Sequence, residues 1–182
     1  MAQTFLKLDT GVTGTLPTSN YVQGGISQVS TWRLSSSFTS DSMPITSNWE
    51  EPDTYGLANG AAIGSDMVVS SGVWTFPVTG IWKIEFYGEF FKGGDSKYNQ
   101  AIIETTTDDS SYNEAAKSSS HIKHTESGTT YSNSLAVCIF DVTNVSTHKC
   151  RLGTSVSENT VTTAGHTSTN KTMVNFIRLG DT

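Results

Sequence analysis

One stretch of the sequence, residues 80–91, constrains the fold more than any other. It reads GIWKIEFYGEFF, and large apolar side chains occupy every second position over most of its length. One alternate set holds Trp82, Ile84, Phe86 and Phe90, and the other holds Lys83, Glu85 and Glu89. A period of two is that of a β-strand with one face in a core and the other outside. The stretch therefore predicts a long core strand.

A turn signal precedes this strand. The segment Phe76-Pro77-Val78-Thr79-Gly80 separates it from a second apolar run at residues 72–76. Proline fixes one backbone dihedral, and glycine adopts conformations that other residues resist. The segment should let the chain reverse between two core strands, so the role predicted for the whole stretch is structural.

The rest of the chain also has strand periodicity, and helical periodicity is absent. Further strands are expected at 31–38, 67–69, 98–105, 112–121, 132–142, 148–156 and 173–179, separated by clusters of Gly, Asn, Asp and Ser. Many short strands joined by such turns are typical of sandwiches and jelly rolls. The predicted fold is an all-β antiparallel jelly-roll sandwich with an extended N-terminal arm.

The length of 182 residues fits one domain with an arm. Charged residues make up 15% of the chain and hydrophobic residues 35%, while Ser and Thr total roughly 50, so the few apolar residues must be concentrated in strands. The first thirty residues are polar and punctuated by Gly and Pro. We expect an attachment arm over residues 1–30 and the jelly-roll domain over residues 31–182.

Charge and hydropathy argue against several classes of partner. The net charge of −6 disfavours nucleic-acid binding, which usually needs a basic face. No apolar run of about 18 residues is present, so we expect no membrane insertion. The start Met1-Ala2-Gln3-Thr4 lacks the features of a secretory signal peptide, which predicts synthesis in a cytosol.

One strand candidate is apolar in both alternate sets. In Ser134-Leu135-Ala136-Val137-Cys138-Ile139-Phe140, a sandwich core can cover only one face. The segment 173–177 has the same property more weakly. Another copy of the chain is the simplest cover for the second face, because closed homo-oligomers commonly bury such patches. A Phe140→Asp substitution is expected to disturb that assembly.

The two cysteines, Cys138 and Cys150, lie in candidate strands that follow each other along the chain. A cross-strand disulfide is conceivable. The alternative, which the absence of a secretory signal favours, is two free thiols that act as small buried hydrophobes.

The sequence predicts no catalytic, cofactor-binding or metal-ligating residue. His121 and His124 are spaced for one face of a helix, not of a strand. Two acidic clusters are candidates for calcium or simply solvated loop charge: Glu50-Glu51-Pro52-Asp53 and Thr107-Asp108-Asp109. Glu85 and Glu89 lie on one strand face about 13 Å apart, too far for glycosidase chemistry.

Two aromatic residues in polar surroundings are candidates for stacking on sugar rings. Trp49 is followed by Glu50 and Asp53, and Tyr112 is followed by Asn113. The alternative for both is a semi-buried packing role, which we favour.

The opening stretch resembles a family signature. Trp74, five residues, Gly80, and then aromatic residues at Trp82 and Phe86 are similar to the signature of the globular head of complement component 1q. That head shares a trimeric jelly roll with tumour-necrosis-factor cytokines. The chain departs from the pattern at Ile84, where Phe is usual, and upstream at Ala62 and Met67. The resemblance implies a homotrimer.

A second resemblance covers most of the chain by texture. Gly14-Thr15-Leu16-Pro17, Trp32-Arg33-Leu34 and the ending at residues 176–182 look like small structural proteins of marine tailed bacteriophages, including cyanophages. It implies a non-enzymatic virion protein, made in the host cytoplasm and carried in a fibre or tail appendage. The N-terminal arm would bind other virion proteins, and the jelly roll would meet a host surface glycan or protein.

Two alternative functions remain open at the level of sequence. A decoration or cement protein would stabilise the capsid or tail by binding its neighbours through broad apolar faces. A glycan-cleaving depolymerase would need two acids at catalytic separation in a groove, which the sequence does not offer.

Overall fold

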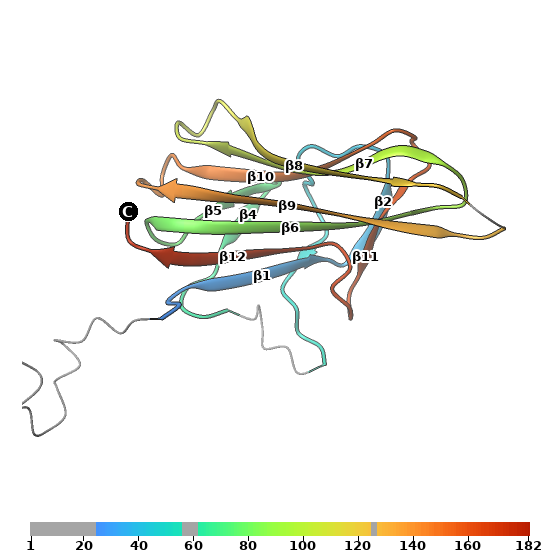
Figure 1. The fold of residues 1–182 in the computed structure, drawn as a ribbon. Helices are drawn as coiled ribbons and strands as arrows, with labels where there is room; N and C mark the ends of the chain where they lie inside the picture. Colours follow the sequence, from blue (N-terminus) through green and yellow to red (C-terminus); the bar gives the residue numbers. More distant parts are fainter. Residues whose placement is uncertain (1–24, 56–61, 125–126) are drawn as a thin grey trace, which may run out of the picture.

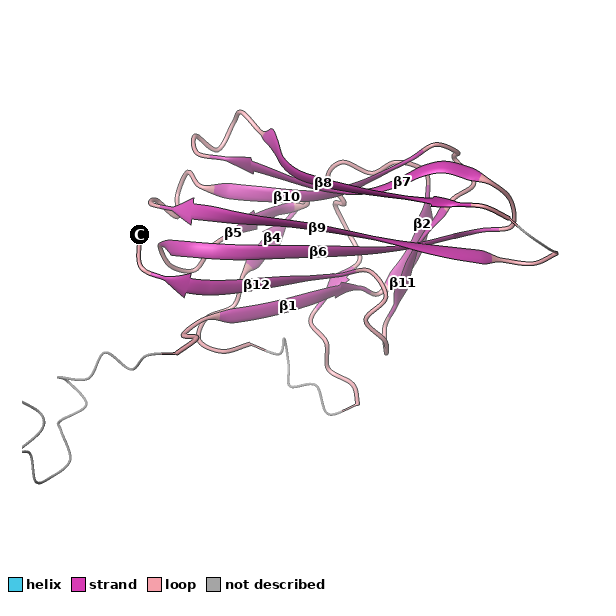
Figure 2. Ribbon diagram, in the orientation of Figure 1, coloured by secondary structure: helices cyan, strands magenta, loops and turns pink. Residues whose placement is uncertain are grey.

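The computed structural model describes residues 25–55, 62–124 and 127–182, and within these ranges the chain forms strands and loops but no helix (Figures 1 and 2). The strands are β1 (Val29–Leu34), β2 (Ser36–Thr39), β3 (Trp49–Glu50), β4 (Val68–Ser70), β5 (Val73–Thr75), β6 (Gly80–Lys92), β7 (Ser96–Thr106), β8 (Asn113–Ile122), β9 (Thr130–Val142), β10 (Lys149–Val156), β11 (Thr162–His166) and β12 (Met173–Gly180). The pairs they form are antiparallel, which confirms the predicted fold class.

The strands form two sheets that face each other. The seven-stranded sheet has the order β2-β11-β6-β12-β1-β3, with β9 paired to β6. The five-stranded sheet has the order β4-β5-β10-β7-β8. β6 organises the first sheet, because it pairs with β9 along its whole length and with both β12 and β11 on its other side (Figure 1).

The alternation predicted for residues 80–91 is confirmed along β6. Trp82, Ile84, Phe86 and Phe90 are fully buried, and the residues between them are half-buried on the outer face. Gly88 also lies on the core side, where an added Cβ would come within 2.9 Å of the Phe90 ring. The aromatic side chain therefore fills the space that the glycine leaves.

An aromatic cluster joins the two sheets. Trp74 from β5 lies with its ring centroid 5.3 Å from that of Trp32 on β1 and 5.0 Å from that of Phe176 on β12. Phe76, which follows β5, lies 5.3 Å from Trp82 on β6. Because these pairs cross between the sheets, the cluster forms the centre of the sandwich core.

The Pro77–Gly80 turn joins two core strands, as predicted, and these strands belong to different sheets. β5 ends in the five-stranded sheet and β6 begins in the seven-stranded sheet. The Trp82 indole NH donates to the carbonyl oxygen of Val78 at 3.2 Å, which ties the turn to the strand that follows it. The turn thus carries the chain across the sandwich.

β9 has one face in the core and one face exposed. Ala136 is buried, and Cys138 and Phe140 are half-buried and pack against the core, while Leu135, Val137 and Ile139 are exposed. The prediction that this strand carries apolar side chains on both faces is confirmed. Phe140 lies on the core side of the strand, with its ring 5.8 Å from that of Phe76, so Phe140→Asp would disturb the core as well as any assembly.

Three details of the strands differ from expectation. The segment predicted as one strand over 31–38 is two, β1 and β2, which pair with different neighbours. β11 has the sequence Thr-Thr-Ala-Gly-His, which lacks the large apolar residues that identify strands. β3 contains only two residues. Tertiary pairing, not local preference, makes β3 and β11 strands.

Different segments of the chain lie at the two ends of the sandwich. Residues 1–24 of the predicted arm lie outside the described residues, and the chain enters the sheet at β1 from Gly25. The start of β1 and the C-terminus lie at one end of the sandwich (Figure 1). The β6–β7 turn at residues 93–95 lies at the opposite end, which we call the far end.

Both cysteines are free thiols in the structure. Cys138 is on β9 and Cys150 on β10, so they belong to different sheets and not to adjacent strands. Burial raises the pKa of the Cys138 thiol to about 11 and raises that of Cys150 well above its ordinary value. Both thiols are therefore held in the protonated, unreactive form.

Candidate functional site

The outer face of β9 carries a row of exposed apolar side chains. Four residues form this row, which we call the β9 face: Tyr131 (56% exposed), Leu135 (51%), Val137 (41%) and Ile139 (59%). They pair in register with Phe91, Tyr87, Glu85 and Lys83 of β6. The Tyr131 ring lies 5.4 Å from the Phe91 ring. Asn133 separates Tyr131 from the other three, and Leu135, Val137 and Ile139 follow one another on this face. A row of exposed apolar side chains like this one marks an interaction surface.

The charges beside the β9 face are paired. Lys83 Nζ lies 2.6 Å from Glu85 Oε1, and Lys171 Nζ lies 3.5 Å from Glu89 Oε1. The two carboxylates whose separation argued against glycosidase chemistry are thus each neutralised by a lysine. This arrangement lowers the cost of covering the face with another protein surface.

A hollow of about 420 Å³ opens on the same face. Its lining includes Tyr87, Leu135 and Met173 together with Asn170. The Asn170 side-chain oxygen is buried and has no hydrogen-bond donor within the described residues. Burial, and then the charge of Glu89, raise the pKa of Tyr87, which stays a neutral phenol. A partner that supplied an apolar group and one donor would complete this hollow.

Two carboxylates of the first acidic cluster, Glu50 and Asp53, are paired with a buried arginine. Arg33, which is fully buried on β1, lies 2.8 Å from Glu50 and 2.9 Å from Asp53. It also donates to Thr54 Oγ1 at 3.2 Å and to the carbonyl oxygen of Thr167. The cluster is therefore a clamp around one guanidinium group. Arg33 lies 17 positions before Glu50, and no local pattern in the sequence points to this pairing.

The second acidic cluster forms a turn. Asp108 accepts hydrogen bonds from the backbone NH groups of Ser110 (2.9 Å) and Ser111 (2.7 Å) and from Thr106 Oγ1 (2.7 Å). These bonds, led by the one from Ser111, hold the pKa of Asp108 well below its ordinary value. The carboxylate is used in shaping the β7–β8 connection.

The two aromatic candidates for sugar stacking are both occupied. Trp49 packs 5.3 Å from Trp74 and donates its indole NH to the carbonyl oxygen of Ile45 at 3.0 Å. The Arg151 guanidinium carbon lies 3.8 Å from the centre of the Tyr112 ring, so that ring face is covered. The packing role favoured from the sequence agrees with both observations.

The histidine pair lies at the far end of the sandwich. His121 is an exposed residue near the end of β8, and His124 follows the strand, with its Nε2 atom 3.1 Å from the carbonyl oxygen of Gly128. Among the described residues, no group of three or more His, Cys, Asp or Glu side chains is placed to hold a metal ion. The described residues also contain no helix long and apolar enough to cross a membrane.

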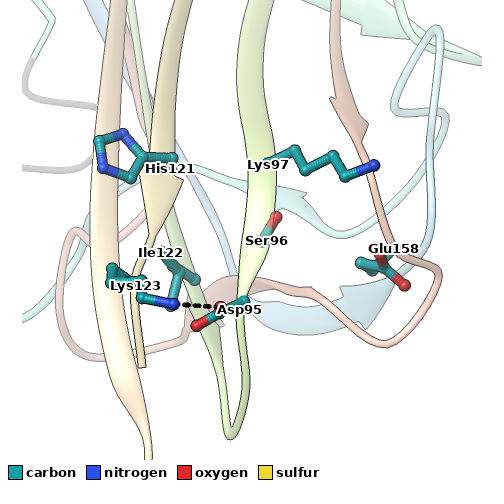
Figure 3. A pocket seen from close by; sticks show the side chains of 7 residues that line it. All are labelled: Asp95, Ser96, Lys97, His121, Ile122, Lys123 and Glu158. Carbon is teal, nitrogen blue, oxygen red and sulfur yellow. Dashed lines mark hydrogen bonds and ion pairs between the residues drawn. The ribbon is translucent and has the colours of Figure 1, made fainter. Parts of the chain in front are cut away.

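A second hollow of about 420 Å³ lies beside this pair, and we call it the far-end hollow. Figure 3 shows its lining, which comes from the start of β7, the end of β8 and the β10–β11 loop. Ser96 and Ile122 lie in the middle, with Lys97 and Glu158 to one side and His121 to the other (Figure 3). In the sequence only the histidines stand close together, because these three segments are distant in the chain.

One ion pair closes an end of the far-end hollow. Lys123 Nζ lies 2.6 Å from Asp95 Oδ2, and the backbone NH of His124 donates to Asp95 Oδ1 at 2.8 Å (Figure 3). The hydrogen bond from Lys123 and then that from His124 hold the pKa of Asp95 below its ordinary value. Asp95 is therefore a fixed, ionised acceptor.

The similarity of this chain to known proteins is found in its structure and not in its sequence. No family model matches the sequence, and no curated protein matches it. The structure is similar to Eiger TNF from S. frugiperda, with a TM-score of 0.60 and 9% identity over 85% of this chain and 93% of that chain. It is also similar to murine APRIL at pH 5.0, with a TM-score of 0.57 and 8% identity over 84% of this chain and 98% of that chain.

A second structure of murine APRIL, at pH 8.5, gives a TM-score of 0.55 and 10% identity. Identities this low show a shared fold and nothing finer. The two antiparallel sheets and these matches together establish that the chain folds as a TNF-like jelly roll.

Proposed function

We propose that the protein is a non-enzymatic structural component of a bacteriophage particle. In this proposal it forms a homotrimer in a fibre or appendage, is tethered by its N-terminal arm and meets the host surface at its far end. The resemblance to phage structural proteins supports the setting, and the TNF-like jelly roll supports the trimeric arrangement that the complement-head resemblance implies.

The observation that carries the proposal is the β9 face. Its four apolar side chains are between 41% and 59% exposed in a single copy, next to charges that are already paired. Burying apolar area contributes about 25 cal/mol per Å², so a second copy that covered this row would be held by it. The unfilled hollow beside Leu135 provides room for side chains of that copy.

The test is the mass of the protein in solution. We expect the full-length chain to have three times its single-copy mass of 19.6 kDa by light scattering. Ile139→Asp, on the β9 face, should give single copies, because it places a charge in the buried contact. Val68→Asp is the matched control, since Val68 is 62% exposed on β4 of the other sheet. A single-copy mass for the unaltered chain would reject the homotrimer.

The alternative, a cement protein, is favoured by one observation. The two aromatic residues that the sequence suggested for sugar stacking, Trp49 and Tyr112, are occupied by intramolecular contacts. A version of the chain that begins at Gly25 separates the two functions, because it retains the described strands. If only the full-length chain attaches to particles lacking the protein, the arm is the tether. Equal attachment of both would favour cement.

A further inference from the structure

The far-end hollow lies where a displayed ligand site would be expected. It is formed at the end of the sandwich opposite the start of β1 and the C-terminus (Figure 1). A domain held by its N-terminal segment would present this end away from its attachment point. The volume of about 420 Å³ falls within the range of small-ligand sites.

The floor of the hollow is held rigidly. Ser96 is buried, and its Oγ donates to Asn99 Oδ1 at 2.7 Å and lies 3.1 Å from Ser157 Oγ. Ser157 Oγ also accepts from the backbone NH of Lys97 at 2.8 Å, which joins β7 to the β10–β11 loop. Asn99 is fully buried and donates to Ser132 Oγ at 3.0 Å. A ligand would meet a preformed surface and would not have to order it.

The rim carries polar groups that are not used elsewhere. In the described part of the chain, neither the Lys97 ammonium group nor the His121 ring has a hydrogen-bond or ion-pair partner. The Glu158 carboxylate has only a long contact of 3.9 Å with Lys92. Lys97 extends toward Glu158 on one side of the hollow, and His121 turns to the other (Figure 3). The rim of the hollow therefore carries both hydrogen-bond donors and hydrogen-bond acceptors.

The charged, polar and apolar groups that line the far-end hollow favour some classes of ligand over others. Asp95 and Glu158 would repel a polyanion such as a nucleic acid. The stems of Lys97 and Lys123 offer apolar surface, while the groups beside them offer both donors and acceptors. Hydroxyl groups on a ring of C–H bonds have the same combination. We propose that the far-end hollow binds a saccharide through hydrogen bonds to its hydroxyl groups.

This inference rests on the proposed display function for its biological role, because it names what the far end would meet on a host surface. The hollow itself is built within one copy. Binding can therefore be measured whether or not the chain forms a trimer, and the two proposals can fail separately.

The experiment uses saturation-transfer NMR on the full-length protein with three neutral trisaccharides: maltotriose, mannotriose and cellotriose. We expect signal transfer to at least one of them. Lys97→Gln combined with Glu158→Gln should reduce that transfer at least fivefold, because both side chains lose the charge that strengthens their hydrogen bonds to hydroxyl groups. Lys117→Gln is the matched control, since Lys117 is an exposed lysine on β8 that pairs with Glu114 outside the hollow.

Three outcomes would overturn the inference. The first is no transfer to any trisaccharide, and the second is transfer that the double variant leaves unchanged. The third is displacement of the bound trisaccharide by sodium sulfate at a concentration equal to that of the sugar, which would show a simple anion site. The mass of the same sample separates the proposals: a trimer that binds no sugar contradicts only this inference, and a single-copy protein that binds sugar contradicts only the homotrimer.

Discussion

Arg33 shows how much a single residue can organise in this chain. Its guanidinium group is fully buried, and it connects β1 to Glu50, Asp53 and Thr54 and to the loop that contains Thr167. An arginine fork suits this arrangement, because its five donors point in fixed directions within one plane. The residues it binds are up to 134 positions away in the sequence.

Replacement of Arg33 should weaken the fold more than loss of an ordinary surface charge. We expect Arg33→Ala to lower the free energy of unfolding by about 2–4 kcal/mol, because the partners lose their donor and a buried space opens. Arg33→Lys should recover only part of this loss, because lysine lacks the fork. Urea unfolding measures the effect. Lys117, which forms an exposed ion pair with Glu114, provides the control: Lys117→Ala should change the free energy of unfolding by less than about 1 kcal/mol. An effect of Arg33→Ala as small as that would contradict the role of Arg33.

At the scale of the element, β11 shows a strand specified by its neighbours. Its partners are β2 on one side and β6 on the other, and Thr163 and Ala164 are buried between them. The strand contains Gly165, where an added Cβ would lie 2.4 Å from the backbone of Ser36. The close approach of β2 therefore requires the absence of a side chain at this position.

A methyl group at this position should disrupt the edge of the sheet. We expect Gly165→Ala to lower the free energy of unfolding by about 1–3 kcal/mol, because the backbone of Ser36 cannot move aside as a side chain would. Thermal unfolding measures the change. Gly180→Ala provides the comparison, since nothing lies within 4 Å of a Cβ built at Gly180. Equal stability of the two variants would show that β2 adapts without cost.

At the scale of the whole molecule, the aromatic cluster makes the two sheets one structure. Trp74 belongs to the five-stranded sheet, yet its ring contacts Trp32 and Phe176 of the seven-stranded sheet. In a chain with only 35% hydrophobic residues, a few large rings supply much of the contact between layers. Loss of the central ring should affect both sheets together.

We expect Trp74→Ala to lower the free energy of unfolding by about 3–5 kcal/mol, as other large core truncations do. The far-ultraviolet and near-ultraviolet circular dichroism transitions should still coincide, because the sheets cannot remain folded separately. Two resolved transitions would show instead that each sheet is stable alone. Trp74→Phe should cost less, because it keeps most of the ring and removes an indole NH that has no acceptor among the described residues.

The sequence determined the elements in which periodicity and burial agree. The alternation along residues 80–91 predicted β6, and the doubly apolar segment 134–140 predicted that β9 would keep an exposed apolar face. These features are local, because side chains two positions apart in a strand share a face wherever the strand lies. The all-β antiparallel class followed from repeating that reasoning along the chain.

Only the tertiary structure decided which distant groups meet. It placed Glu50 and Asp53 around Arg33, put Cys138 and Cys150 in different sheets, and turned Phe140 toward the core. It also brought Lys97, His121 and Glu158 to one hollow from three separate segments. The reason is that strand order and sheet packing are set by contacts across the fold, and local periodicity carries no information about them.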